Sequence, residues 1–111
     1  MFTLLALHLS LAHAADTIQA NLIAGATAAA VRTATTPVPV ATFTFKGAEY
    51  TVGCKGASPT LSCAVRQAAV LGFNQAETLT SCLMSKSGNR LITETTIPAL
   101  GGQKIEFGLL Q

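Results

Sequence analysis

Two parts of the chain alternate apolar and polar residues with a period of two, which is the pattern of half-buried β-strands. Phenylalanines alternate with threonines in residues 40–46, and alternation resumes in residues 49–54 after a short break that contains Gly47. A glycine supplies the backbone conformation that a tight turn needs. Residues 91–97 and 105–109 alternate in the same way on either side of a Pro- and Gly-containing break at residues 98–102. The pattern therefore predicts two β-hairpins.

Between the hairpins, the apolar residues have a helical spacing. Ser58 and Pro59 combine an N-cap acceptor with a proline at the first helical position, and Gly72 ends this predicted helix. Asn74 and Glu77 match a capping box that starts a second helix, which closes near residue 86. The apolar stripes are Leu61, Ala64, Val65, Ala68 and Leu71 in the first helix, and Ala76, Leu79, Thr80, Leu83 and Met84 in the second.

The order ββααββ predicts an α+β fold. Its simplest form is a four-stranded, mainly antiparallel sheet with a two-helix hairpin packed on one face.

The N-terminal residues have the features of a secretory signal peptide. Residues 2–12 are apolar, and residues 12–14, Ala-His-Ala, match the small-x-small sequence at a signal peptidase site. As a helix this stretch rises only about 21 Å at ~1.5 Å per residue, less than the ~30 Å hydrocarbon core of a membrane. We therefore predict a signal peptide at residues 1–14 and a secreted protein without a stable membrane span. A membrane anchor and an ordinary buried helix are the alternatives.

Residues 15–38 are rich in alanine and threonine and contain no aromatic side chain. This composition is typical of an extension outside a folded domain, and a short helix that packs on the domain is the alternative. The predicted organisation is a signal peptide at 1–14, an Ala/Thr-rich extension at 15–38 and one small domain at 39–111.

The composition indicates a folded, weakly charged domain. Half of the residues are hydrophobic, 11% are charged, and the formal net charge is +2. Lysines and arginines are scattered without interleaved aromatic residues, so we do not expect a nucleic-acid partner.

Secretion places Cys54, Cys63 and Cys82 in an oxidising compartment, where suitably placed pairs form disulfides. In a helical hairpin that turns at residues 72–73, Cys63 and Cys82 are level with each other, so we predict a Cys63–Cys82 disulfide. A Cys54–Cys63 bond is the alternative, because a short loop separates Cys54 from the first helical turns. Cys54 is then the candidate free thiol, which is buried, reactive or bonded to another molecule.

The sequence also excludes several chemistries. Both histidines, His8 and His13, lie in the predicted signal peptide, so the mature chain has no imidazole for nucleophilic pairs or acid-base catalysis. The cysteines lack the paired spacing of zinc sites, and the glutamates lie one per predicted element. We therefore expect a non-enzymatic protein with no catalytic, cofactor-binding or metal-ligating residues and no cofactor.

Residues 52–58, followed by Cys63, resemble the start of the fungal killer-toxin domains. The resemblance implies a secreted α/β sandwich with a helix pair on a sheet. It covers about a dozen residues of a chain that lacks the many cysteines of that family.

The sequence therefore favours a small secreted interaction protein, effector- or toxin-like, that binds a protein or a cell surface and is stabilised by one disulfide. The alternative is a structural subunit of an extracellular coat, fibre or surface assembly, which the low charge and the third cysteine would suit.

Overall fold

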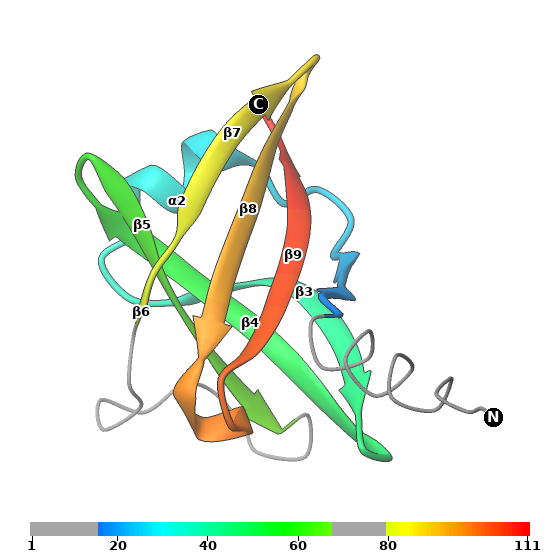
Figure 1. Ribbon diagram of the computed structural model, residues 1–111. Coiled ribbons are helices and arrows are strands. Elements are labelled where there is room, and N and C mark those ends of the chain that lie inside the picture. Colours follow the sequence, from blue (N-terminus) through cyan, green and yellow to red (C-terminus); the bar gives the residue numbers. More distant parts are fainter. Residues whose placement is uncertain (1–15, 68–79) are drawn as a thin grey trace, which may run out of the picture.

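Two β-sheets and one short helix dominate residues 16–67 and 80–111, the part of the chain that the computed structural model describes (Figure 1). The elements in chain order are β1 (Ile18–Gln19), β2 (Asn21–Leu22), α2 (Ala28–Thr33), β3 (Val38–Phe45), β4 (Ala48–Ala57), β5 (Thr60–Gln67), β6 (Thr80–Ser81), β7 (Leu83–Ser87), β8 (Arg90–Ile97), the 3-10 turn η1 (Pro98–Leu100) and β9 (Gln103–Leu110).

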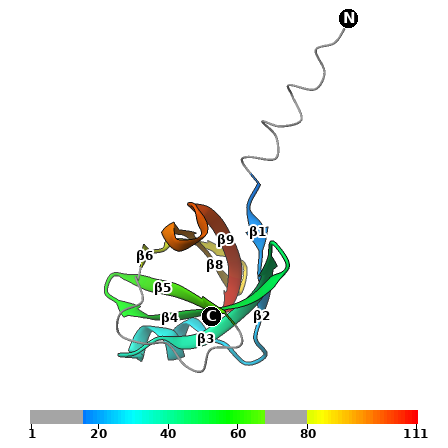
Figure 2. The same ribbon diagram turned by 90° about the horizontal axis from the view of Figure 1, so that it is seen from below.

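Two segments of the chain pass from one sheet to the other and form corners between them. The strand order is β1-β9-β8-β7 in one sheet and β2-β3-β4-β5-β6 in the other. β1 and β2 belong to one chain segment that changes sheet at Ala20, and β6 and β7 belong to another that changes sheet at Cys82. Strands that switch sheets in this way make the corners of crossed β-sheet packings. Figures 1 and 2 show the sheets crossing each other.

The core lies between the sheets, and α2 adds to it. Alternate residues of β8 and β9 are buried, as expected for strands with one face on a core. The largest fully buried apolar side chains are Leu61, Ile105, Leu109, Val31, Val40 and Val52. Full burial of one such side chain contributes roughly 1.5–3 kcal/mol, so this cluster is the main source of stability.

Both predicted hairpins are confirmed. β3 pairs antiparallel with β4, and β8 pairs antiparallel with β9. The first hairpin turns at Lys46 and Gly47, which both have positive φ angles of 50° and 81°. Two positive φ angles are the requirement of the type I′ turn, whose twist matches that of the flanking strands. The second hairpin turns through η1 and two glycines, Gly101 and Gly102, with positive φ.

The predicted α+β fold with a two-helix hairpin is wrong. Residues 60–67, expected in the first helix, form β5, and residues 80–87, expected in the second, form β6 and β7. Ser58 and Pro59 lie in the turn between β4 and β5 instead of at a helix start. The physical reason is pairing, because β5 lies between β4 and β6 and its backbone bonds to both. The remainder of the predicted helices falls in residues 68–79, outside the described residues.

Residues 16–38 belong to the two-sheet domain, which differs from the predicted extension. β1 pairs with β9 in parallel and β2 pairs with β3. α2 is capped by Thr27, whose hydroxyl accepts a hydrogen bond from the Ala30 amide at 3.2 Å. Ala28 and Val31 of this helix are at most 1% exposed. The segment therefore supplies two corner strands and part of the core, while the predicted signal peptide lies outside the described residues.

Candidate functional site

The three cysteines meet in the core. Cys54 of β4 and Cys63 of β5 lie directly opposite each other in the strand register and form a disulfide, with 4.1 Å between their Cα atoms. The preferred prediction, Cys63–Cys82, is therefore not the pairing in this structure, and the alternative pairing is. The prediction of level cysteines depended on two helices, whereas the strand register places Cys54 beside Cys63.

Cys82 is the free cysteine, in place of the predicted Cys54. It lies at the corner between β6 and β7, is 3% exposed, and its amide donates a hydrogen bond to the Leu61 carbonyl at 3.2 Å. Its Sγ lies 2.9 Å from the Sγ of Cys63. One thiol therefore sits in direct contact with one sulfur of the disulfide. We call Cys54, Cys63 and Cys82 the sulfur cluster.

Two threonine hydroxyls lie beside the sulfur cluster. Thr80 of β6 and Thr95 of β8 are 2.6 Å apart at their Oγ1 atoms. The Thr80 hydroxyl also contacts the Cys63 carbonyl at 3.4 Å, and the Thr95 hydroxyl contacts the Ser81 carbonyl at 3.5 Å. These partners satisfy hydroxyl groups that would otherwise be costly to bury. The hydroxyl pair also bridges the two sheets where the chain passes from one to the other.

Burial raises the pKa of the Cys82 thiol to about 11, and a hydrogen bond with the Thr95 side chain partly opposes this effect. Desolvation has this direction because a thiolate in an apolar core loses its hydration. At neutral pH the Cys82 side chain is therefore a protonated and weakly nucleophilic thiol.

We expect the folded protein to lose stability as the pH rises from about 9 to about 11. In the unfolded chain the Cys82 thiol loses its proton near the lower value, whereas in the folded chain it keeps the proton up to the higher one. The unfolded state then binds fewer protons, so the free energy of unfolding falls with pH. At ~1.36 kcal/mol per pH unit, the loss amounts to roughly 3 kcal/mol and is absent below the lower pH.

Urea denaturation of the wild type and of the Cys82→Ser variant across this range measures the effect. The variant differs from the wild type at residue 82 alone, so the difference between the two proteins isolates Cys82. Parallel pH dependences in both proteins would contradict the prediction.

A second feature lies on the outer face of the four-stranded sheet. Leu83, the first residue of β7, is 72% exposed and is the one large hydrophobic side chain that is exposed among the described residues. It faces Glu94 of β8 across the sheet, and Glu94 faces Glu106 of β9. A hollow of about 230 Å³ is lined by Leu83, Met84, Ser85, Ile92, Glu94 and Glu106. Leu83 was predicted on the inner face of a helix, and the structure corrects this placement.

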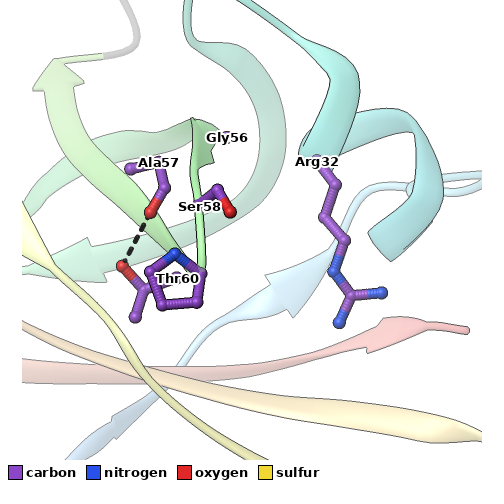
Figure 3. A pocket seen from close by; sticks show the side chains of 6 residues that line it. Arg32, Gly56, Ala57, Ser58 and Thr60 are labelled. Atoms are coloured by element: carbon purple, nitrogen blue, oxygen red, sulfur yellow. Dashed lines mark hydrogen bonds between the residues drawn. The ribbon is translucent and has the colours of Figure 1, made fainter.

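A third feature is a hollow of about 260 Å³ between the C-terminal end of α2 and the β4–β5 turn. Figure 3 shows Arg32 on one side and Ser58 on the other, with the Thr60 hydroxyl donating to the Ala57 carbonyl at 3.1 Å. Gly56 lines this hollow, and its amide donates a hydrogen bond to the Ala34 carbonyl at 3.2 Å. One guanidinium and one hydroxyl form no nucleophile-base pair, so this hollow has no catalytic arrangement.

Two further observations concern the described residues alone. No group of three His, Cys, Asp or Glu side chains there is placed to hold a metal ion. None of the helices in that part is long and apolar enough to cross a membrane.

Comparisons with known proteins add no identification. The chain matches no protein-family model, no curated protein and no solved structure. Function must therefore be inferred from the residues and their geometry.

Proposed function

We propose that this protein is a small secreted, non-enzymatic interaction protein that binds an extended, positively charged segment of a partner protein. Its contact face is the outer surface of the four-stranded sheet, made of Leu83, Ser85, Ile92, Glu94 and Glu106. The observation that carries the proposal is the exposure of Leu83, 72%, at the start of an edge strand and beside a hollow. Leu83 lines this hollow together with Met84 and Ile92, so the apolar surface extends beyond one side chain. An apolar patch rimmed by polar groups is typical of an interaction site.

The position of β7 in the sheet supports binding of an extended segment. β7 ends the strand order of its sheet and pairs only with β8 among the described residues. The backbone groups on its outer side are therefore available to a further strand. Strand addition takes its affinity from main-chain hydrogen bonds and its specificity from side chains in neighbouring hollows.

The charges on the contact face support a cationic partner. Glu94 and Glu106 are directly opposite in the register. Like charges in opposite positions destabilise a sheet, and a lysine or arginine placed between them would relieve that repulsion. Arg90 lies on the same face, and its Nη1 is 3.2 Å from the Gly108 carbonyl, to which it donates. Lys104, beyond Glu106 on β9, limits the acidic region to this pair of carboxylates.

The predicted signal peptide and the disulfide support secretion. Disulfides persist in oxidising compartments and are rare in the cytosol. The Cys54–Cys63 bond is compatible with an extracellular protein.

We expect an extended peptide of alternating lysine and valine to bind the wild-type protein and to bind its Leu83→Ser variant about 5- to 10-fold more weakly, equivalent to roughly 1–1.4 kcal/mol. The variant removes the apolar side chain while leaving the backbone edge in place. Titration of the ¹⁵N-labelled protein, followed by NMR, gives the affinity and locates the contact from the shifts of β7, Ile92 and Glu94.

The matched peptide of alternating glutamate and valine should bind more weakly than the basic one. A Thr44→Ala variant, changed at an exposed position of the other sheet, should bind like the wild type. Equal binding of both peptides, or shifts confined to residues away from the contact face, would count against the proposal.

A structural subunit of an extracellular coat, fibre or surface assembly is the second candidate, and the same β7 edge favours it. Two copies can pair through an exposed edge strand, with one β7 beside the other. Sedimentation velocity distinguishes the candidates. Assembly predicts a concentration-dependent dimer that a Leu83→Lys substitution disrupts, whereas a monomer at every concentration contradicts assembly.

A further inference from the structure

The sulfur cluster brings a thiol to the contact distance of a thiol-disulfide exchange reaction. The Sγ of Cys82 lies 2.9 Å from the Sγ of Cys63, which is bonded to Cys54. In well-oriented reacting pairs the reacting atoms are about 3–3.5 Å apart. The attacking and the attacked sulfur are therefore already in contact, although 19 residues separate them in the chain.

We propose that the protein has two disulfide isomers, Cys54–Cys63 and Cys63–Cys82, which interconvert by internal exchange. The Cys82 thiol gives its proton to water, and its thiolate attacks the Sγ of Cys63. The Cys63–Cys82 bond forms as the Cys54–Cys63 bond breaks, and the electron pair of the broken bond leaves on Cys54. The Cys54 thiolate then takes up a proton. One disulfide and one thiol are present before and after, so the reaction needs no oxidant or reductant.

Burial makes this exchange an internal one. Cys54 and Cys63 are 0% exposed, and Cys82 is 3% exposed. A thiol from solution therefore has no direct access to the disulfide in the folded protein. The groups that face Cys82 are Cys63 on β5, Thr80 on β6 and Thr95 on β8, and none of them is charged. The raised pKa of the Cys82 thiol keeps the thiolate scarce and the exchange slow at neutral pH. The exchange becomes faster as the pH rises, because the fraction of thiolate increases.

The two isomers tie different elements together. Cys54–Cys63 joins β4 to β5, which are already neighbours in the five-stranded sheet. Cys63–Cys82 would join β5 to the corner at which the chain leaves that sheet and begins β7. Leu83, the most exposed side chain of the contact face, follows Cys82 directly. The second isomer thus anchors the start of β7. This consequence is independent of whether the contact face binds the partner proposed above.

Free-thiol mapping of the secreted, mature protein tests the proposal. Samples are held at a series of pH values, quenched in acid, unfolded in acid and labelled with a maleimide before reduction and digestion with trypsin. Cleavage after Lys46, Lys55, Arg66 and Lys86 places each cysteine in a separate peptide. We expect label on both the Cys54 and the Cys82 peptides. The fraction of label on the Cys54 peptide should rise to a constant value. The rate of this rise should increase about tenfold per pH unit while the pH is below the pKa of Cys82.

Label on the Cys82 peptide alone, at every pH and time, would overturn the proposal. Label on the Cys63 peptide would also overturn it, because it would indicate general scrambling instead of exchange at one sulfur. A Cys54→Ser variant gives a second test that does not depend on the position of the equilibrium. It should form Cys63–Cys82 under the mild oxidant that closes Cys54–Cys63 in a Cys82→Ser variant, with an unchanged circular dichroism spectrum. A Cys54→Ser variant that stays reduced under these conditions would show that the fold does not hold Cys63 and Cys82 in contact.

Discussion

Replacing Phe107 by alanine is expected to lower the free energy of unfolding by about 3–5 kcal/mol. Phe107 lies in the middle of β9, is 2% exposed, and faces Thr93 of β8 in the register. Its ring belongs to the buried core cluster, so its removal loses apolar burial and leaves a cavity. For a domain whose total stability is of order 5–15 kcal/mol, such a loss is a large fraction. Urea denaturation followed by circular dichroism measures it.

Phe45→Ala is the matched control for this substitution. Phe45 is half-buried at the end of β3, where the Lys46 Nζ lies 5.3 Å from the centre of its ring. The chemical change is identical, but the ring leaves a position that already contacts solvent. We expect a loss below about 1.5 kcal/mol, which includes the cation-π contact. Equal losses in the two variants would show that Phe107 is not a core residue.

The hairpins could be predicted because their signals are local. In the β3–β4 hairpin, strand alternation and a glycine at a turn position occur within about a dozen residues of one another. The type I′ turn at Lys46 and Gly47 fixes the register, so the alternating residues face the core without help from distant parts of the chain.

β5 could not be predicted because its sequence fits two periods. Leu61, Ala64 and Val65 have helical spacing, whereas Leu61, Cys63 and Val65 alternate as a strand does. Ser58 and Pro59 fit a helix start as well as they fit a turn. The choice between these conformations is made by pairing with β4 and β6, and pairing is not visible in a local pattern.

The error in secondary structure carried over to the candidate site. In the predicted helical hairpin, Cys63 and Cys82 lie side by side on the two helices, and Cys54 is the free thiol. With β5 as a strand, the register places Cys63 opposite Cys54, and Cys82 at a corner still reaches the same sulfur. The prediction correctly brought Cys63 and Cys82 together but assigned the bond to the wrong neighbour. The exposure of Leu83 was missed for the same reason.

The corner strands carried no usable sequence signal. β1 and β2 contain two residues each, within a segment rich in alanine and threonine. Strands of this length show no alternation. Their place is set by β9 and β3, to which they pair, and the burial of Ala28 and Val31 in α2 likewise depends on the two sheets.

Replacing Gly56 by alanine is expected to lower the free energy of unfolding by about 2–4 kcal/mol. A methyl group at this position would overlap the carbonyl oxygen of Arg32 and lie 2.9 Å from its carbonyl carbon. These atoms belong to the backbone at the end of α2, so they cannot move aside as the tip of a flexible side chain can. Relief of the overlap requires α2 to move away from β4. That movement would break the hydrogen bond from the Gly56 amide to the Ala34 carbonyl. It would also bring solvent to the side chain of Val31, which is only 1% exposed in the folded protein.

Gly108→Ala is the matched control, because it makes the same change in β9, a strand of the other sheet, where the atoms nearest to the new methyl group belong to side chains and not to the backbone. A methyl group at Gly108 would meet the end of the Ile92 side chain at 3.3 Å and the Arg90 Cδ at 3.4 Å, and both side chains can rotate. We expect a change within about 1 kcal/mol there, measured by urea denaturation of both variants. The comparison tests whether α2 is docked on β4. If Gly56→Ala were as stable as Gly108→Ala, then α2 would not be held against β4.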